Sequence, residues 1–118
     1  MGTFSVDVEI GDPDGREFIV VNALVDTGAP YTALPESLLQ RLRVRPRADR
    51  RFRLADGRVV RLPLGVTVMR FMDEEWPVYV IFAPDDSQPL LGATALEAFS
   101  LVVDLNEGRL VPADALLL

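Results

Sequence analysis

The stretch Ala23-Leu24-Val25-Asp26-Thr27-Gly28-Ala29 carries an acidic residue from the end of an apolar run directly into a turn that contains glycine. This acid is important because the sequence contains no Cys, no His and no Lys. Without them the chain cannot build a Cys/His or Ser/His nucleophile pair, a zinc site on His or Cys, a Schiff base or a Walker-type phosphate lysine. Any chemistry that this protein performs must therefore use carboxylates.

The size and composition of the chain predict one globular domain over residues 1–118. The sequence is 49% hydrophobic and 25% charged, a balance typical of a folded protein with a core. We expect no signal peptide, because the first residues have no basic segment followed by an apolar run, and the longest apolar runs are too short to span a bilayer. The absence of Cys fits a reducing compartment, so we expect a cytoplasmic protein with no membrane partner.

Charge is distributed unevenly along the chain. The net charge of −6 argues against nucleic acid as a partner, because phosphate neutralisation needs clustered positive charge. Nine of the twelve Arg residues nevertheless lie between Arg41 and Arg61, with only two acids, so this segment carries a charge of +7. Such a stripe is most often a solvated face. If it flanked a substrate cleft it would favour acidic substrates, and Arg51 and Arg53 are the positions at which to test this.

Alternating and β-branched apolar residues predict an all-β domain. Strands are expected over residues 4–10, 17–25, 64–71 and 78–82, with a C-terminal pair over 101–105 and 109–111. Residues 52–54 and 59–62 flank Ala55-Asp56-Gly57-Arg58, which predicts a protruding hairpin. The acidic stretch Asp73-Glu74-Glu75 is expected as a turn. Two short helices are expected over 35–42 and 93–99. This order favours a mostly antiparallel barrel or sandwich.

An Asp before Thr-Gly commonly caps a turn by accepting backbone N–H groups, so the tripeptide alone has a purely structural interpretation. The wider pattern is more specific. Asp26-Thr27-Gly28-Ala29, a later hairpin tipped by glycine and Leu90-Leu91-Gly92 before a short helix occur in an order that resembles the retropepsin (retroviral-type) aspartic proteases, and most closely their bacterial single-domain members. The resemblance implies a closed barrel of mostly antiparallel strands with one or two short helices.

The resemblance also implies roles for individual residues. Asp26 would be the catalytic carboxylate, Thr27 would hold two active-site loops together, and Gly28 would lie close to the substrate backbone. Support of the active-site loop falls to Thr27, Gly28, Ala29, Leu91 and Gly92, and the flap tip to Ala55, Asp56 and Gly57. No metal and no cofactor are implied. Pro30 and Tyr31 stand where viral members carry acidic or polar residues, so the inner subsites are expected to differ.

Peptide hydrolysis by carboxylates requires two of them, one to deprotonate water and a protonated one to polarise the carbonyl oxygen. Because the chain contains a single Asp-Thr-Gly, the second carboxylate must come from another copy, and we expect a homodimer that binds an extended peptide. Two carboxylates about 3 Å apart cannot both ionise, so activity is expected on the acidic side of neutrality. Apolar candidates for the substrate pockets, which could equally be core, are Leu24, Ala29, Leu34, Val59, Ile81 and Phe82.

Three alternatives remain at the level of the sequence. The first is a retropepsin-like dimer that binds partners without turnover. The second is an unrelated monomeric β-barrel in which Asp26 only caps a turn. The third is metal-dependent hydrolysis by Asp73-Glu74-Glu75, which is disfavoured because three consecutive acids in a turn cannot converge on one ion.

Overall fold

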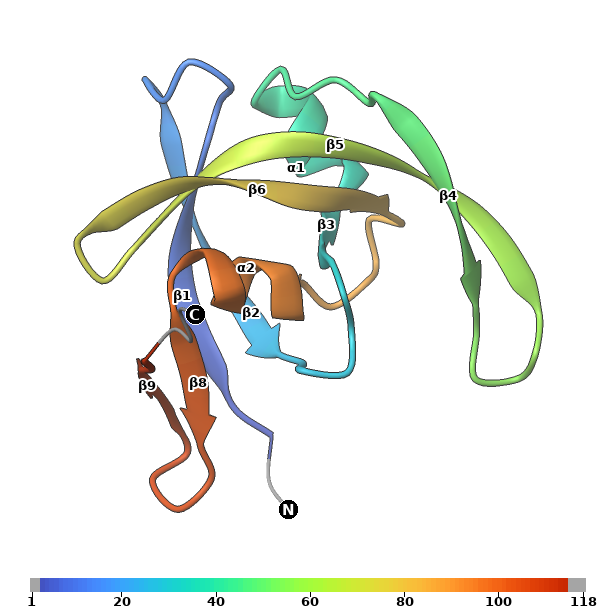
Figure 1. Cartoon of the computed structure of the whole chain (residues 1–118). Coiled ribbons are helices and arrows are strands. Elements are labelled where there is room, and N and C mark those ends of the chain that lie inside the picture. Colours follow the sequence, from blue (N-terminus) through green and yellow to red (C-terminus); the bar gives the residue numbers. More distant parts are fainter. Residues whose placement is uncertain (1–2, 115–118) are drawn as a thin grey trace, which may run out of the picture.

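Strands dominate residues 3–114, the part of the chain that the computed structural model describes (Figure 1). In chain order the elements are β1 (Ser5–Gly11), β2 (Phe18–Val25), β3 (Thr32–Pro35), α1 (Glu36–Arg41), β4 (Ala48–Arg53), β5 (Val59–Phe71), β6 (Glu74–Ala83), β7 (Leu90–Leu91), α2 (Ala93–Ala98), β8 (Leu101–Asp104) and β9 (Arg109–Pro112). The predicted all-β class with two short helices is confirmed. Neither helix in this described part is long and apolar enough to cross a bilayer.

Seven strands form one sheet in the order β1-β2-β7-β3-β6-β5-β4. Strand β1 also pairs with β5, through Glu9–Gly11 and Val68–Arg70, so the sheet returns on itself and leaves β4 outside the ring of pairings. Most neighbours are antiparallel, as predicted, whereas β2–β7 and β3–β6 are parallel. Strands β8 and β9 form a separate antiparallel pair.

Two local predictions were wrong in detail. Strand β5 runs without a break from Val59 to Phe71 and includes Pro63. Pro63 pairs with Asp49 of β4 and precedes Leu64, where the pairing with β6 begins, so its missing N–H is tolerated there. The acidic turn is shorter than expected, because Glu74 and Glu75 already belong to β6. Met72 and Asp73 make the turn with φ values of 49° and 64°, the left-handed pair that joins twisted strands tightly. The predicted turn is therefore present, but it comprises Met72 and Asp73 and contains no glycine.

The core lies between the inner faces of the strands and the two short helices. Helix α1 buries Leu39, and its C-cap Leu42 is also buried, so this apolar side of the helix faces inward. Helix α2 buries Ala95 and Leu96, and Phe99 just beyond it meets Phe71 of β5 edge-on, with ring centroids 6.3 Å apart. Each fully buried leucine contributes roughly 1.5–3 kcal/mol.

A buried acid fixes the turn between β1 and β2. The Asp12 carboxylate accepts hydrogen bonds from the backbone N–H groups of Arg16 (2.7 Å) and Glu17 (3.1 Å) and pairs with Arg43 (3.3 Å). The Glu17 and Arg16 N–H groups, helped by Arg43, hold the pKa of Asp12 below its ordinary value of 3.8 and outweigh the opposing effect of burial. The turn is thereby tied to the residues that follow α1.

Candidate active site

The loop that contains Asp26 joins β2 to β3, and β7 lies between these two strands. Leu24 and Val25 pair in parallel with Leu90 and Leu91, while Ala33 pairs with Leu90 from the other side. The Asp26 N–H also donates to the Leu91 carbonyl at 3.0 Å. Both ends of the Asp26 loop are therefore held by one two-residue strand.

The start of α2 holds the middle of the same loop. The Ala93 N–H donates to the Ala29 carbonyl at 2.8 Å. Thr94 donates twice to the Pro30 carbonyl, from its N–H at 3.0 Å and its Oγ1 at 2.7 Å. The buried Thr32 Oγ1 accepts from the Gly92 N–H at 3.1 Å. Sequence inspection had missed Thr94, because nothing local to α2 indicates a partner so far away along the chain.

Gly92 is required by a close approach of two backbones. A Cβ at this position would lie 2.4 Å from the carbonyl carbon of Tyr31, 2.5 Å from its oxygen and 2.8 Å from the Thr32 nitrogen. All three atoms belong to the main chain, so no side-chain rotation could relieve the clash. The glycine therefore lets the loop and the start of α2 pack in direct contact.

Asp26 lies half-buried at the surface of this loop. Its Oδ1 accepts the Gly28 N–H at 3.0 Å, and its carbonyl accepts the Ala29 N–H at 3.2 Å. Within one chain this is the geometry of an Asx turn, which agrees with the structural interpretation of the tripeptide. The loop differs from an ordinary Asx turn in its surroundings. It is bonded to β7 and to the start of α2, while Thr27 and Gly28 remain exposed.

The predicted protruding hairpin is confirmed. Strand β4 and the first part of β5 form an arm that projects from the body (Figure 1). Its tip is closed by hydrogen bonds from Leu54 N–H to the Arg58 carbonyl (2.7 Å) and from Gly57 N–H to the Leu54 carbonyl (2.9 Å). Gly57 has a φ of 90°, which suits only glycine without strain. Ala55, Asp56 and Gly57 are all exposed at this tip.

Charge at the tip is internally paired. Arg58 donates from its backbone N–H (2.9 Å) and from Nε (2.7 Å) to the Asp56 carboxylate. These contacts, the backbone one first, lower the pKa of Asp56, so the carboxylate stays ionised at mildly acidic pH.

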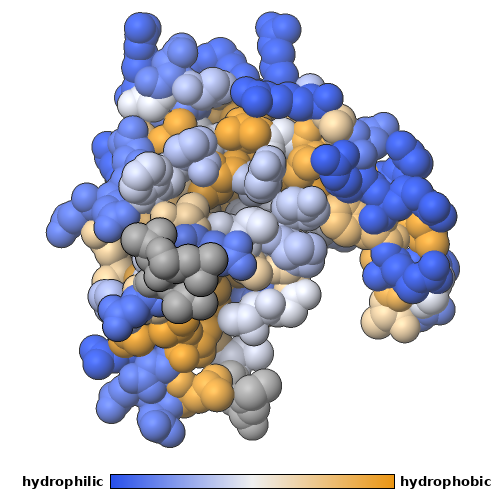
Figure 2. All heavy atoms as spheres, in the orientation of Figure 1, coloured by the Kyte–Doolittle hydropathy of each residue, from blue (hydrophilic) through white to orange (hydrophobic). Residues whose placement is uncertain are grey.

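The space-filling view shows a hollow between the arm and the body (Figure 2). Of the apolar residues considered for substrate pockets, Leu34, Ile81 and Phe82 are buried and belong to the core. Val59 lies on the arm and is 40% exposed, and Leu24 and Ala29 are half-buried. These last three are the ones that remain accessible enough to contact a ligand.

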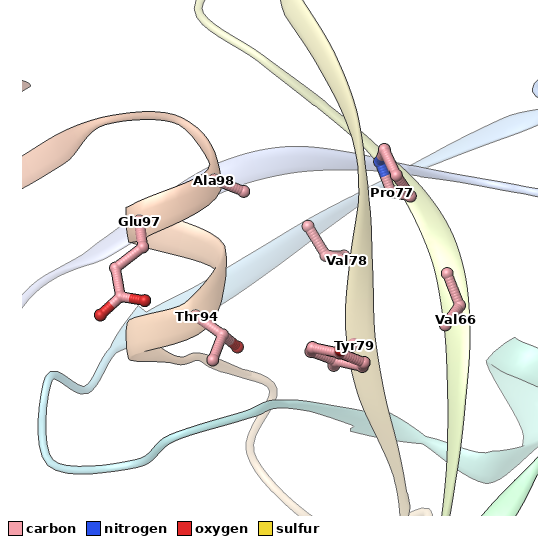
Figure 3. A pocket seen from close by; sticks show the side chains of 7 residues that line it. All are labelled: Val66, Pro77, Val78, Tyr79, Thr94, Glu97 and Ala98. Atoms are coloured by element: carbon pink, nitrogen blue, oxygen red, sulfur yellow. The ribbon is translucent and has the colours of Figure 1, made fainter. Parts of the chain in front are cut away.

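A concavity of about 550 Å³ does not include Asp26. It lies between α2 and strands β5 and β6 (Figure 3), where it is lined by Val66, Pro77, Val78, Tyr79, Thr94, Glu97 and Ala98. Glu97 is the single carboxylate among these residues, so the concavity has no acid–base pair. Size alone therefore does not identify it as a catalytic site, and the Asp26 loop remains the candidate.

The acids of the β5–β6 turn have no metal-site geometry. Within residues 3–114, no three Asp or Glu side chains cluster closely enough to hold a metal ion. Glu74 is engaged instead as the acceptor of the Trp76 Nε1–H at 2.6 Å.

Solved structures similar to this chain define the class of the fold. EIAV protease in complex with the inhibitor HBY-793 matches with a TM-score of 0.62 and 20% identity over 83% of this chain and 88% of that one. A retropepsin-like aspartic protease from Rickettsia conorii gives 0.58 and 20% over 88% and 89%. The retroviral protease-like domain of Ddi1 from Leishmania major gives 0.58 and 17% over 98% and 91%. The fold is that of the retropepsins.

Residues 6–95 match the model of a family described as aspartyl protease. This match spans more than half of the chain, so the chain belongs to the aspartyl protease family. Comparison with curated protein sequences gives no match. Family membership supports a protease function in general, and the alternative of an unrelated β-barrel is wrong.

Proposed function

We propose that this protein is an aspartic endopeptidase whose active unit is a homodimer with one Asp26 from each subunit. The observation that carries the proposal is the Asp26 loop itself. The chain has one Asp-Thr-Gly, its carboxylate is half-buried at the surface, and the loop around it is pinned by β7 and α2. A rigid loop that presents a single acid fits a site completed by a second copy across a two-fold axis.

The proposed chemistry divides acid and base roles between the two Asp26 carboxyl groups, which share one proton. The ionised group removes a proton from water as the water oxygen bonds to the peptide carbonyl carbon, and the protonated group donates its proton to the carbonyl oxygen. When the tetrahedral intermediate collapses, the C–N bond breaks, the leaving nitrogen takes up a proton from one carboxyl group, and the other carboxylate accepts the proton of a hydroxyl of the intermediate, so that the pair again holds one proton. The products are a carboxylic acid and an amine.

The other predicted site residues support this reaction in the proposal. Thr27 would contact its counterpart in the partner subunit beneath the two carboxyl groups, and the exposed Gly28 would let the substrate backbone approach. The tip Ala55-Asp56-Gly57 would close over an extended peptide and exclude water. Hydrogen bonds to the substrate backbone do not depend on the substrate side chains. Specificity would therefore come from the half-exposed apolar residues near the cleft.

The direct test is hydrolysis of an unstructured protein at about pH 5, where a carboxyl pair can keep one proton. Asp26→Asn should lower kcat by about a thousandfold or more, because the reaction loses its ionisable pair. A pepstatin-like inhibitor should block the wild type. Asp14→Asn is the matched control, since Asp14 lies exposed in the turn between β1 and β2, and it should leave hydrolysis unchanged. Undiminished hydrolysis by Asp26→Asn would refute the assignment.

A mixing experiment tests the shared site. Wild-type and Asp26→Asn subunits are combined in equal amounts and allowed to exchange. If both carboxyl groups of a dimer are needed, the mixture should have about a quarter of the activity of the same total amount of wild-type protein. Retention of about half would mean that each chain works alone, against the proposal.

The likeness to the Ddi1 domain, described as protease-like, supports a second candidate, a dimeric module that binds peptides without cleaving them. This candidate predicts a stable dimer that hydrolyses nothing between about pH 4 and 7, the range in which carboxyl groups change charge.

A further inference from the structure

Tyr31 makes two edge-to-face aromatic contacts with distant parts of the chain. Its ring centroid lies 6.2 Å from that of Phe52 on β4, with an interplanar angle of 86°, and 5.8 Å from that of Tyr79 on β6, with an angle of 78°. We call Phe52, Tyr31 and Tyr79 the aromatic bridge. It joins the hairpin arm, the end of the Asp26 loop and the main sheet.

Tyr31, the central residue of the aromatic bridge, lies in a backbone segment that is held by hydrogen bonds on both sides. The preceding carbonyl, of Pro30, accepts two hydrogen bonds from Thr94, and the following residue, Thr32, is buried and bonded to the Gly92 N–H. The Tyr31 carbonyl lies directly against Gly92. This backbone cannot shift without breaking contacts that also hold the Asp26 loop.

Phe52 lies on β4, which has one neighbouring strand. Strand β4 is at the edge of the sheet, and its residues pair with Val59–Leu64 of β5. Five of its six residues are exposed, and Phe52 is the one that is half-buried. The contact with Tyr31 is therefore the point at which a β4 side chain packs against the body.

We propose that the aromatic bridge positions the hairpin arm over the Asp26 loop and thereby sets how readily the cleft opens to a polypeptide; its link to turnover rests on the proposed function. The Tyr79 ring on β6 packs against the Tyr31 ring, and the Tyr31 ring in turn packs against Phe52 of the arm. A weaker bridge lowers the fraction of molecules with the arm in place, which raises the apparent dissociation constant of a substrate by the same factor. The three residues are positioning residues, because they act through the arm.

Hydrogen exchange in the ligand-free protein tests the bridge without reference to activity. Phe52→Leu and Tyr79→Ala should speed exchange of arm amides in residues 48–53 and 59–62 by roughly three- to tenfold, the factor that the coupling of an aromatic pair represents. Amides of β1 and β2 should exchange as in the wild type. Tyr79→Phe keeps the ring and should restore wild-type exchange.

Trp76→Ala is the matched control. Trp76 is on the same strand as Tyr79 and is similarly exposed, 46% against 51%, but its indole N–H bonds to Glu74. Its removal should leave exchange in the arm unchanged.

Steady-state kinetics distinguish an effect on the position of the arm, which changes KM, from a distortion of the Asp26 loop, which lowers kcat. Phe52→Leu should raise KM by up to about threefold, less than it speeds exchange, because KM depends on the fraction of molecules with the arm in place. It should change kcat less than about twofold. Unchanged exchange of the arm in both Phe52→Leu and Tyr79→Ala would overturn the proposal, as would faster exchange throughout the chain or a fall in kcat at constant KM. Faster exchange confined to the arm would support it even if the wild type hydrolysed nothing, in which case only the proposed function would fail.

Discussion

The Asp26 loop and the hairpin arm are built in opposite ways. The loop is bonded to β7 at both ends and to α2 in its middle. The arm has an exposed edge strand, and its tip is closed mainly by its own hydrogen bonds. Chemistry needs carboxylates held to within fractions of an ångström, whereas a polypeptide must be admitted past an element that opens at low cost. Each region has the support that its proposed task requires.

The largest effect is expected from Gly92→Ala, which attacks the rigid region. The new Cβ would overlap main-chain atoms of Tyr31, so the loop and α2 must move apart, at a cost of about 3 kcal/mol in the free energy of unfolding. A displacement of about 1 Å at Asp26 would lower kcat/KM on the order of a hundredfold. Urea unfolding and peptide hydrolysis measure the two effects.

Gly28→Ala is the control for this substitution, as a test of stability alone. Its Cβ would meet Asp26 Oδ1 at 3.4 Å, an ordinary contact, and should leave the unfolding free energy within about 0.5 kcal/mol. Equal destabilisation by the two substitutions would contradict the contrast between the packed start of α2 and the exposed turn.

The second-largest effect is expected from low pH, which should lower the stability of the body more than that of the arm. Both Asp12 and Asp56 have lowered pKa values, but Asp12 is buried and Asp56 is exposed at the tip. A carboxyl group with a depressed folded-state pKa contributes stability above its unfolded value, near 3.8, and loses it as the pH falls through the folded value. Stability at pH 5 should therefore be retained and should fall below about pH 4.

Asp12→Asn should remove a large part of this acid sensitivity and lower stability at pH 7, where the wild-type carboxylate is ionised and bonded. Asp56→Asn should leave the pH dependence of the melting temperature unchanged, because an exposed ion pair contributes little. Thermal melts between pH 2 and 7, on the order of the carboxyl range, make the comparison. Identical curves for Asp12→Asn and the wild type would show that another acid governs the transition.

A smaller effect is expected from Thr94→Val, which keeps the shape of the side chain and removes the 2.7 Å hydrogen bond to Pro30. Loss of one such bond costs about 1 kcal/mol, and the Thr94 N–H still reaches the same carbonyl. Unfolding should become easier by that amount, while Thr94→Ser, which keeps the hydroxyl, should stay within about 0.5 kcal/mol of the wild type. A larger loss with serine than with valine would mean that packing matters more than the hydrogen bond.

The smallest effects are expected from charge reversal on the arm. Alternation along β4 places Arg50 on the face of Phe52, toward the body, and Arg51 and Arg53 on the other face. Arg50→Glu should therefore lower kcat/KM for an acidic peptide, by less than about fivefold, since exposed pairs are weak. Arg51→Glu, a variant outside the cleft, should leave that preference unchanged.

Arg51→Glu should instead stabilise the arm slightly. Arg51 stands directly opposite Arg61 in the β4–β5 pairing, so the substitution replaces a repulsive pair with an attractive one, worth about 0.2–1 kcal/mol at low salt. Exchange of arm amides measures this, and an effect that persists in high salt would contradict an electrostatic origin.

Local sequence patterns predicted most of the elements because they depend on near neighbours. Alternating residues in β1 and the Asp-Gly hairpin at residues 56 and 57 are of this kind. The turn between β5 and β6 was predicted, but its bounds were not, because no glycine marks the positive φ values of Met72 and Asp73. Thr94 and the partners of Tyr31 were missed for another reason, since their contacts join residues that are far apart in the chain.

The sequence by itself determined that the chain has no Cys, His or Lys, that Asp26 follows an apolar strand and enters a glycine turn, and that the fold consists mainly of strands. Only the tertiary structure decided that β7 lies between the strands flanking Asp26, that Gly92 touches the Tyr31 backbone, and that Phe52 meets Tyr31. The Thr94–Pro30 and Gly92–Thr32 bonds span 64 and 60 residues. Contacts of that range depend on the whole path of the chain, which local propensity does not encode.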